Sequence, residues 1–383
     1  MIARPPMIRT DASNAFAHNT MRVRVPDIIR DTQTLNPGFS PMINHALDAL
    51  REGMENNAPI PPLQLPAPDY DGWLAAYQAH AGETWLNTEW FYAEVYFYRL
   101  LIEAVRWWET GLDPFAAKKQ EELASTKLWE LVETALSAEG SLEERLAELL
   151  AFDLWGNRID LSFAASMAHG SHATDDDLLA DDRDQIVPHL LRTDGAIHFI
   201  IDNTGTELAM DLVLVDTLLR EVTDNVVLHL KMHPTFVSDA TVSDTWELIR
   251  RLEKHDKPTL AELGKRLHTA AEQARLRLIP DFYWNSTVLM RDMPARITAV
   301  LQDARMVFVK GDANYRRLVD DALWLPDTPF TAVVDYFPAP VTALRSLKSD
   351  TIVGLPTGLA EQLDTIDPQW RVNGKRGVLQ ARF

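Results

Sequence analysis

Three side chains with oxygen donors, Asp202, Asn203 and Asp239, could together hold one divalent metal ion. Carboxylate and amide oxygens are hard ligands that suit Mg²⁺ or Mn²⁺. Asp202 and Asn203 are adjacent where a predicted strand ends, so both can reach the same ion, and Asp239 follows the next predicted strand. The same residue types also cap helices. From these residues alone, helix capping and metal ligation are equally good interpretations.

Four basic residues near other predicted strand ends would suit a phosphate group, namely Lys310, Arg316, Arg345 and Lys348. An ammonium supplies a point charge, and a guanidinium supplies a fork that matches two phosphate oxygens. A metal and these cations would oppose the charge of a transferring phosphoryl group, and the metal can activate water. The pattern favours a phosphoryl-transfer site, although a lone lysine such as Lys348 is more often a solvated surface residue.

Short runs rich in β-branched residues would carry these side chains at their ends. The runs alternate with helical segments, which is typical of a parallel sheet covered on both faces. Ligands of such sheets bind beyond the carboxyl ends of the strands. We therefore expect an α/β fold, with an α/β/α three-layer metal-binding catalytic domain and a mainly parallel sheet over residues 186–383. The runs are residues 196–201, 225–230, 305–309 and 331–335.

Residues 1–185 are expected to form an N-terminal segment and a helical domain. Residues 1–40 look irregular, apart from a short alternating stretch that Pro26 ends. Residues 55–70 carry five prolines, which indicates an extended linker or loop. Residues 85–109 have apolar groups on nearly all faces, as a buried helix does.

Four histidines invite a metal interpretation that we do not adopt. His169 and His172 lie in the polar, acidic segment 169–184, which lacks helical spacing and a second ligand pair, so a connector is the better interpretation. His229 and His233 are four residues apart near a predicted strand. We expect His229 to be packed in the core, whereas His233 could line the cleft.

The composition excludes several kinds of site and partner. The 383 residues include no cysteine, which excludes disulfides, thiolate metal sites and thiol catalysis. The net charge of −19 and the lack of a Lys/Arg cluster argue against nucleic acids and anionic membranes as partners. No apolar run reaches about 18 residues, and the N-terminus lacks a secretory signal. We expect a cytoplasmic protein whose partner is a small phosphorylated metabolite.

Seven longer motifs extend over nearly the whole chain. They are WFYAEVYFYR at 90–99, LWGNRIDLS at 154–162, DNTGTEL at 202–208, FVSDA at 236–240, KGDANYRRL at 310–318, ALRSLK at 343–348 and IVGLPTG at 352–358. With these motifs the chain resembles the damage-control phosphatase family, in particular its subfamily III. Some members of that subfamily have also been described as acidic-residue (protein-glutamate) methyltransferases.

The resemblance implies a metal site and its cofactor. One divalent ion, Mn²⁺, Co²⁺, Ni²⁺ or Mg²⁺, would be held by Asp202, Asn203 and Asp239. Glu207 matches a family glutamate near the metal, where it would position water or contact a substrate hydroxyl. With the resemblance, metal ligation becomes the favoured interpretation of the Asp-Asn pair.

The resemblance also implies substrate contacts. They would come from the segment 312–316, with Asp312, Asn314, Tyr315 and Arg316, and from the lysine that closes the subfamily's Arg-Thr-x-Lys motif. Here that motif runs from Arg345 to Lys348 and has Ser in the Thr position, which keeps the hydroxyl. The implied substrates are sugar phosphates such as fructose 1-phosphate and fructose 6-phosphate.

Three functions follow, in decreasing order of support. The first is a metal-dependent phosphatase of small phosphomonoesters, with attack either by metal-activated water or by an aspartate that forms a phospho-enzyme. The second is an S-adenosylmethionine-dependent protein carboxyl methyltransferase, which the lack of a glycine-rich loop after the first strand disfavours, because only Gly205 is present there. The third is a non-catalytic metabolite-binding protein, and the full set of charged strand-end residues argues against it.

Overall fold

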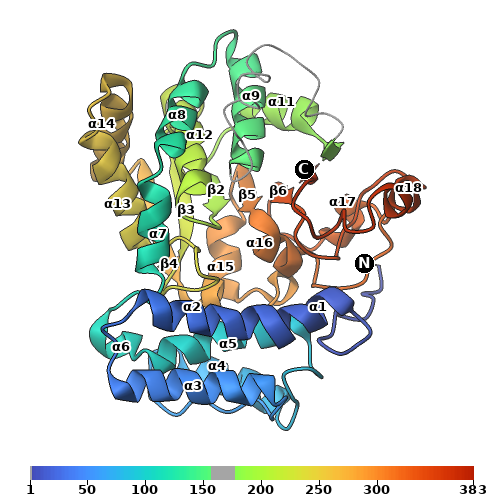
Figure 1. Ribbon diagram of the computed structural model, residues 1–383. Coiled ribbons are helices and arrows are strands. Elements are labelled where there is room, and N and C mark those ends of the chain that lie inside the picture. The colour runs from blue at the N-terminus through green and yellow to red at the C-terminus, as the bar shows by residue number, and fades with distance from the viewer. Residues whose placement is uncertain (1, 157–176) are drawn as a thin grey trace.

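A seven-stranded sheet forms the centre of the computed structural model, which describes residues 2–156 and 177–383 (Figure 1). The strand order is β1-β7-β6-β5-β2-β3-β4, and every neighbouring pair is parallel except β6 and β7. This arrangement confirms the expected α/β fold with a mainly parallel sheet. The strands are β1 Leu178–Asp181, β2 Ile197–Ile200, β3 Val226–Lys231, β4 Leu276–Asp281, β5 Met306–Lys310, β6 Val341–Ser346 and β7 Gly377–Arg382.

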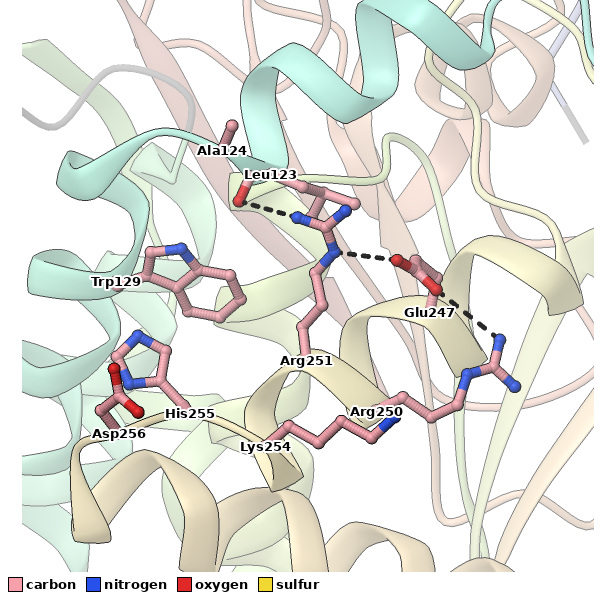
Figure 2. A pocket seen from close by; sticks show the side chains of 9 residues that line it. All are labelled: Leu123, Ala124, Trp129, Glu247, Arg250, Arg251, Lys254, His255 and Asp256. Carbon is pink, nitrogen blue, oxygen red and sulfur yellow. Dashed lines mark hydrogen bonds and ion pairs between the residues drawn. The ribbon is translucent and has the colours of Figure 1, made fainter.

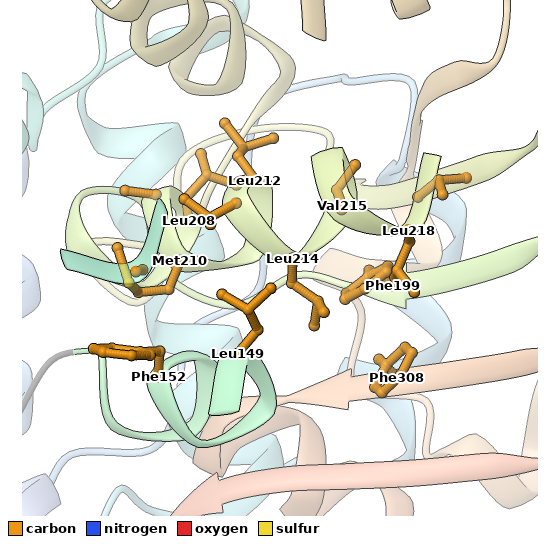
Figure 3. Close-up of a cluster of buried hydrophobic side chains, with 14 of the residues drawn as sticks. Leu149, Phe152, Phe199, Leu208, Met210, Leu212, Leu214, Val215, Leu218 and Phe308 are labelled. Atoms are coloured by element: carbon orange, nitrogen blue, oxygen red, sulfur yellow. The ribbon is translucent and has the colours of Figure 1, made fainter. Parts of the chain in front are cut away.

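Helices cover both faces of the sheet because successive strand residues point to opposite sides. Phe199 and Phe308 pack on one face with helix α12, as Figure 3 shows, whereas Ile200 and Val309 belong to the core on the other face. The helices of the first face are α8 Thr126–Leu136, α9 Leu142–Trp155, α11 Arg183–Arg192, α12 Thr206–Glu221, α13 Val242–Glu253 and α14 Pro258–Glu272. Those of the second face are α15 Ala295–Leu301, α16 Gly311–Leu318, α17 Phe330–Val333 and α18 Leu359–Ile366.

A separate hydrophobic core lies in the N-terminal helical unit, residues 2–115, which lies across one end of the sheet (Figure 1). Every residue of α5 from Trp90 to Ile102 is buried, as its all-round apolar pattern predicts. Helix α7, Ala116–Leu123, leads from this unit to the sheet. The unit contains α1 Ala15–Asn19, the π-helical turn η1 Thr20–Arg24, α2 Val25–Leu35, α3 Pro41–Glu55, α4 Tyr70–Ala79, α5 Trp90–Ala104 and α6 Trp107–Thr110.

Three details of the sequence analysis differ from the structure. The first 40 residues are largely helical, and Pro26 lies in the first turn of α2, where a missing N–H is tolerated. The predicted strand at 331–335 is mostly helix α17, because Pro329 starts a helical turn there and β6 pairs with β5 instead. Helices α8 and α9 precede residue 185, yet their apolar side chains pack in the core of the sheet.

Two buried histidines on neighbouring strands make the fold sensitive to acid. His198 Nδ1 lies 2.9 Å from His229 Nε2, and both rings are buried. Burial lowers the pKa of His198 to about 4 and that of His229 to about 3. The unfolded chain therefore binds protons first, so this pair stabilises the fold fully above about pH 6.5 and progressively less as the pH falls towards 4.

We expect a His198→Leu/His229→Leu double variant to lose less stability on acidification than the parent chain. Between pH 7 and pH 4 the free energy of unfolding should fall by on the order of 6 kcal/mol more in the parent, because each of the two histidines contributes on the order of 3 kcal/mol at about 1.4 kcal/mol per pKa unit. Urea unfolding at several pH values measures this difference. If the free energy of unfolding fell equally with pH in the two proteins, the histidine pair would not be the cause of the acid sensitivity.

Candidate metal and phosphate site

The carboxyl ends of β2, β3 and β5 meet at the point where the sheet topology switches direction. From β2 the chain proceeds outward through β3 and β4, then returns to β5 on the other side of β2. Crevices for ligands form at such switch points. Asp202 follows β2, Asp239 follows β3 and Gly311 follows β5, so the fold brings these three residues to one edge of the sheet.

Backbone and side-chain hydrogen bonds join the two predicted metal-binding segments. Asn203 and Asp239 form an isolated β-bridge, and the Ala240 N–H donates to the Asp202 carbonyl at 2.8 Å. Ser238 Oγ donates to Asn203 Oδ1 at 2.6 Å, and Asn203 Nδ2 donates to Asp202 Oδ2 at 2.9 Å. The structure thus brings Asp202, Asn203 and Asp239 together. Glu207 joins them by accepting from Asn203 Nδ2 at 2.8 Å.

The buried carboxylates of this site lack sufficient positive charge nearby. Burial raises the pKa of Asp202 well above its usual range, and the Asp239 and Glu207 carboxylates raise it further. Burial also raises the pKa of Asp239 to about 6, against the opposing charge of Lys231, whose Nζ lies 3.2 Å from Asp239 Oδ2. Asp202 Oδ1 is buried and has no hydrogen-bond partner among the described residues. An unpartnered buried carboxylate oxygen is costly unless a positive charge compensates it.

The donor set fits a hard divalent ion, with two carboxylates and one amide. Asn203 Oδ1 keeps a free lone pair after accepting from Ser238, because an amide oxygen has two. Within residues 2–156 and 177–383 no three His, Cys, Asp or Glu side chains form a metal-binding group. The fit therefore depends on Asn203 as third ligand, and water and substrate oxygens would complete the coordination.

Gly311 leaves the space that Asp202 occupies. Its φ is +80°, and a Cβ at this position would lie 1.9 Å from Asp202 Oδ2. Any other residue would therefore displace the Asp202 carboxylate. The first turn of α16 approaches the predicted metal ligand this closely only because residue 311 is glycine.

The predicted phosphate-binding residues differ in what they contact. Lys348 is exposed, its charge lowers the pKa of Asp202, and its side chain has no assigned partner in the described residues. Its backbone N–H donates to Asp312 Oδ1 at 3.0 Å. Lys310, in contrast, is buried, with its Nζ 2.5 Å from Asp153 Oδ1 and 3.0 Å from Asp211 Oδ1. Lys348 is available to an incoming anion, and the Lys310 ammonium is committed to two carboxylates.

The other predicted contacts are built into the protein interior. Arg316 pairs with Glu94 at 2.5 Å and with Asp321 at 2.8 Å, and Arg345 pairs with Asp312 at 2.7 Å. Two further members of the set are hydrogen-bonded to the protein. Asn314 Nδ2 donates to the carbonyls of residues 201 and 310, and the Tyr315 hydroxyl donates to residue 380. Each of these side chains is therefore held by partners within the protein.

Sequence reasoning missed three charged residues of this region. Lys231 is the last residue of β3. We looked for polar residues only after the end of each predicted strand, and a search that included the last strand residue would have found Lys231. Asp153 and Asp211 lie in buried, mainly apolar stretches of α9 and α12, where a buried carboxylate requires a partner. The partner, Lys310, is far away in sequence, so no local pattern identifies it.

Other candidate residues lie elsewhere. His229 pairs with His198, and His233 is buried 3.7 Å from Asp69. His169, His172 and residues 157–162 of the LWGNRIDLS motif lie outside the described residues. None of the helices in residues 2–156 or 177–383 has the length and apolar character that a membrane crossing requires.

A cavity of about 520 Å³ between α8 and α13 is not at the strand ends (Figure 2). Arg251 lines it but already donates to Glu247 and to the Leu123 carbonyl. Arg250 also faces Glu247, at 3.8 Å. Opposite charges in this cavity largely satisfy one another, so we assign it no ligand.

Comparisons with known proteins identify the family of the chain. Residues 20–363 match the model of the damage-control phosphatase ARMT1-like domain. The chain is 28% identical to damage-control phosphatase ARMT1 of Xenopus laevis, over 98% of each chain. Identity to the Bos taurus protein of that name is 29%, over 87% of this chain and 85% of that one. Identity to the Homo sapiens protein of that name is 27%, over 96% of each chain.

Among solved structures, a DUF89 family protein from Pyrococcus horikoshii matches with a TM-score of 0.48 and 14% identity, covering 93% of this chain and 96% of that one. The family model spans far more than half of the chain. The chain therefore belongs to the damage-control phosphatase ARMT1-like family, a family of phosphatases that act on small metabolites.

Proposed function

We propose that this chain is a metal-dependent phosphatase that hydrolyses phosphomonoesters of small metabolites, with fructose 1-phosphate and fructose 6-phosphate as its expected substrates. The observation that carries the proposal is the buried pair Asp202 and Asp239, whose pKa values are both raised and whose Asp202 Oδ1 lacks a partner in the described structure. Two such carboxylates at a switch point form a cation site, and an exposed lysine lies within reach of the same edge.

Asp202, Asn203 and Asp239 would hold the metal ion, which in such a site lowers the charge on phosphate oxygens and the pKa of water. Mn²⁺, Co²⁺, Ni²⁺ and Mg²⁺ are the expected ions. Lys348 binds the phosphate, and Asp312 fixes the Lys348 backbone through its N–H. Glu207 holds the Asn203 amide in place. The low accessibility of the carboxylates excludes bulk water, which strengthens each of these interactions.

Phosphate release from fructose phosphates should require added Mn²⁺, Co²⁺, Ni²⁺ or Mg²⁺ and should stop with a chelator. Asp202→Ala should lower kcat/KM by about a hundredfold or more, the effect of losing a preorganised electrostatic group. A colorimetric phosphate assay across sugar phosphates, with each metal in turn, measures both. An unchanged metal-dependent rate in Asp202→Ala would place the active site elsewhere.

The two lysines should respond differently to the same substitution. Lys348→Met should leave the free energy of unfolding unchanged and lower kcat/KM by roughly tenfold or more, because one charged hydrogen bond to phosphate is lost. Lys310→Met should destabilise the fold by roughly 3–5 kcal/mol, because Asp153 and Asp211 lose their buried counter-charge. Urea unfolding and steady-state kinetics on both variants test this. A stable Lys310→Met protein with weakened substrate binding would make Lys310 the phosphate ligand.

Gly311→Ala should weaken Mn²⁺ binding by more than about tenfold, because the new methyl group displaces Asp202. Gly358→Ala is the matched control, since Gly358 has a similar φ of +86° but no heavy atom within 4 Å of the place that a Cβ would take. Alanine at either position must adopt a positive φ, so the two variants differ only in the steric clash with Asp202. Isothermal titration with Mn²⁺ compares them, and equal affinities would mean that Asp202 does not bind the metal.

A further inference from the structure

The loop that carries Asp239 has an unusual backbone. It runs from Met232 to Ala240, between β3 and α13, and within it Phe236 has a φ of +48° and Val237 a φ of +70°. L-residues other than glycine, asparagine and aspartate rarely adopt this region, and a β-branched residue such as valine is especially disfavoured there. Two such residues in succession persist only where surrounding contacts impose the conformation.

The contacts that impose it come from the N-terminal helical unit. The Phe236 ring lies 4.9 Å from the ring of Tyr98, a buried residue of α5. Phe236 and Val237 both pack against the hydrophobic core of that unit rather than against either core of the sheet. The two strained residues therefore point their side chains out of the α/β part of the chain and into the helical part.

A second anchor lies at the start of the same loop. His233 is buried, with its Nε2 3.7 Å from Asp69 and its ring 5.9 Å from that of Trp107. Asp69 is itself held by Arg99 through two hydrogen bonds of 2.8 and 2.9 Å. Burial raises the pKa of Asp69, but the nearby His233 ring and the hydrogen bonds from Arg99 outweigh burial and lower the pKa, so the carboxylate stays ionised.

The end of the loop positions the predicted metal ligands. Ser238 Oγ holds the Asn203 amide oxygen, and the Ala240 N–H holds the Asp202 carbonyl. Asp239 lies between them. If residues 236 and 237 relaxed to ordinary φ values, the loop would displace Asp239 and also Asn203 and Asp202. Of these three predicted metal ligands, only Asp239 belongs to the loop.

We propose that the N-terminal helical unit is a positioning element for the metal site, and that Phe236 is the positioning residue through which it acts. Packing of the partly buried Phe236 ring against Tyr98 stabilises a strained loop, and that strained loop sets Asp239 and Asn203 in place. The proposal depends on the proposed metal site for its effect on metal binding. The restraint on the loop can be measured without metal.

The test combines one disruption, one rescue and a control for each. Phe236→Ala removes the anchor, whereas Phe39→Ala removes a ring of the same helical core that forms no ring pair with the loop in the described structure. In the Phe236→Ala protein, Val237→Gly removes the cost of the positive φ at residue 237. Ala274→Gly removes a similar cost, at φ +57°, at the end of α14. Full-length proteins are used throughout.

Two measurements are made on each protein, namely amide hydrogen exchange of residues 235–240 without metal and Mn²⁺ affinity by isothermal titration. Phe236→Ala should speed exchange and weaken Mn²⁺ binding by about tenfold each, in line with the strain released. Adding Val237→Gly should recover at least half of either change on a logarithmic scale, and adding Ala274→Gly should recover none. Phe39→Ala should lower Tm without a specific effect on the loop.

Rescue separates positioning from general stability, because glycine adds no packing. The proposal is overturned if Phe236→Ala affects the loop no more than Phe39→Ala does, or if Val237→Gly rescues no better than Ala274→Gly. A parent protein that binds no Mn²⁺ would instead refute the proposed metal site, and the exchange data would still decide whether the helical unit restrains the loop.

Discussion

Two carboxylates, Asp202 and Asp239, are buried side by side at the carboxyl ends of neighbouring strands, and much of the surrounding structure can be understood from the cost of that arrangement. Removing like charges from water is unfavourable by several kcal/mol per ion unless opposite charge is supplied nearby. Lys231 supplies part of it, although burial lowers the pKa of that lysine too. The remaining deficit of positive charge is what the proposed metal ion would compensate.

A second buried charge cluster lies at the end of β5. There a lysine has two carboxylate partners, whereas Asp202 and Asp239 share one lysine. Lys310 has two carboxylate partners, Asp153 and Asp211, and the backbone carbonyl of Asp153 accepts a third contact at 3.0 Å. Burial and the neighbouring Asp153 raise the pKa of Asp211, which limits the net charge of the group. In this cluster a lysine is paired with two carboxylates, and the ion pairs fix α9 and α12 against the sheet. The contrast between the two clusters distinguishes the Lys310 ion network from the proposed metal site more clearly than residue type does.

The sequence predicted the parts of this site that depend on local pattern. Runs of β-branched residues located β2, β3 and β5, and the strand-end rule then located Asp202, Asn203 and Asp239. It could not tell β6 from α17, since both contain short apolar runs, and pairing with β5 and β7 decides between them. Nor could it distinguish Lys310 from Lys348, because their roles depend on carboxylates of helices that lie far away in the chain.

The conformation of the Asp239 loop is the feature least accessible to sequence reasoning. Phe and Val have no local preference for positive φ, so nothing in the FVSDA motif predicts the turn that residues 236 and 237 make. The turn exists because a separate core, built from helices of the first 115 residues, accepts both side chains. A sheet of this topology brings side chains together at its switch point, and under our proposal the helical unit holds the Asp239 loop so that Asp202, Asn203 and Asp239 converge there. Under this proposal the two parts of the chain form one functional unit, although each has its own hydrophobic core.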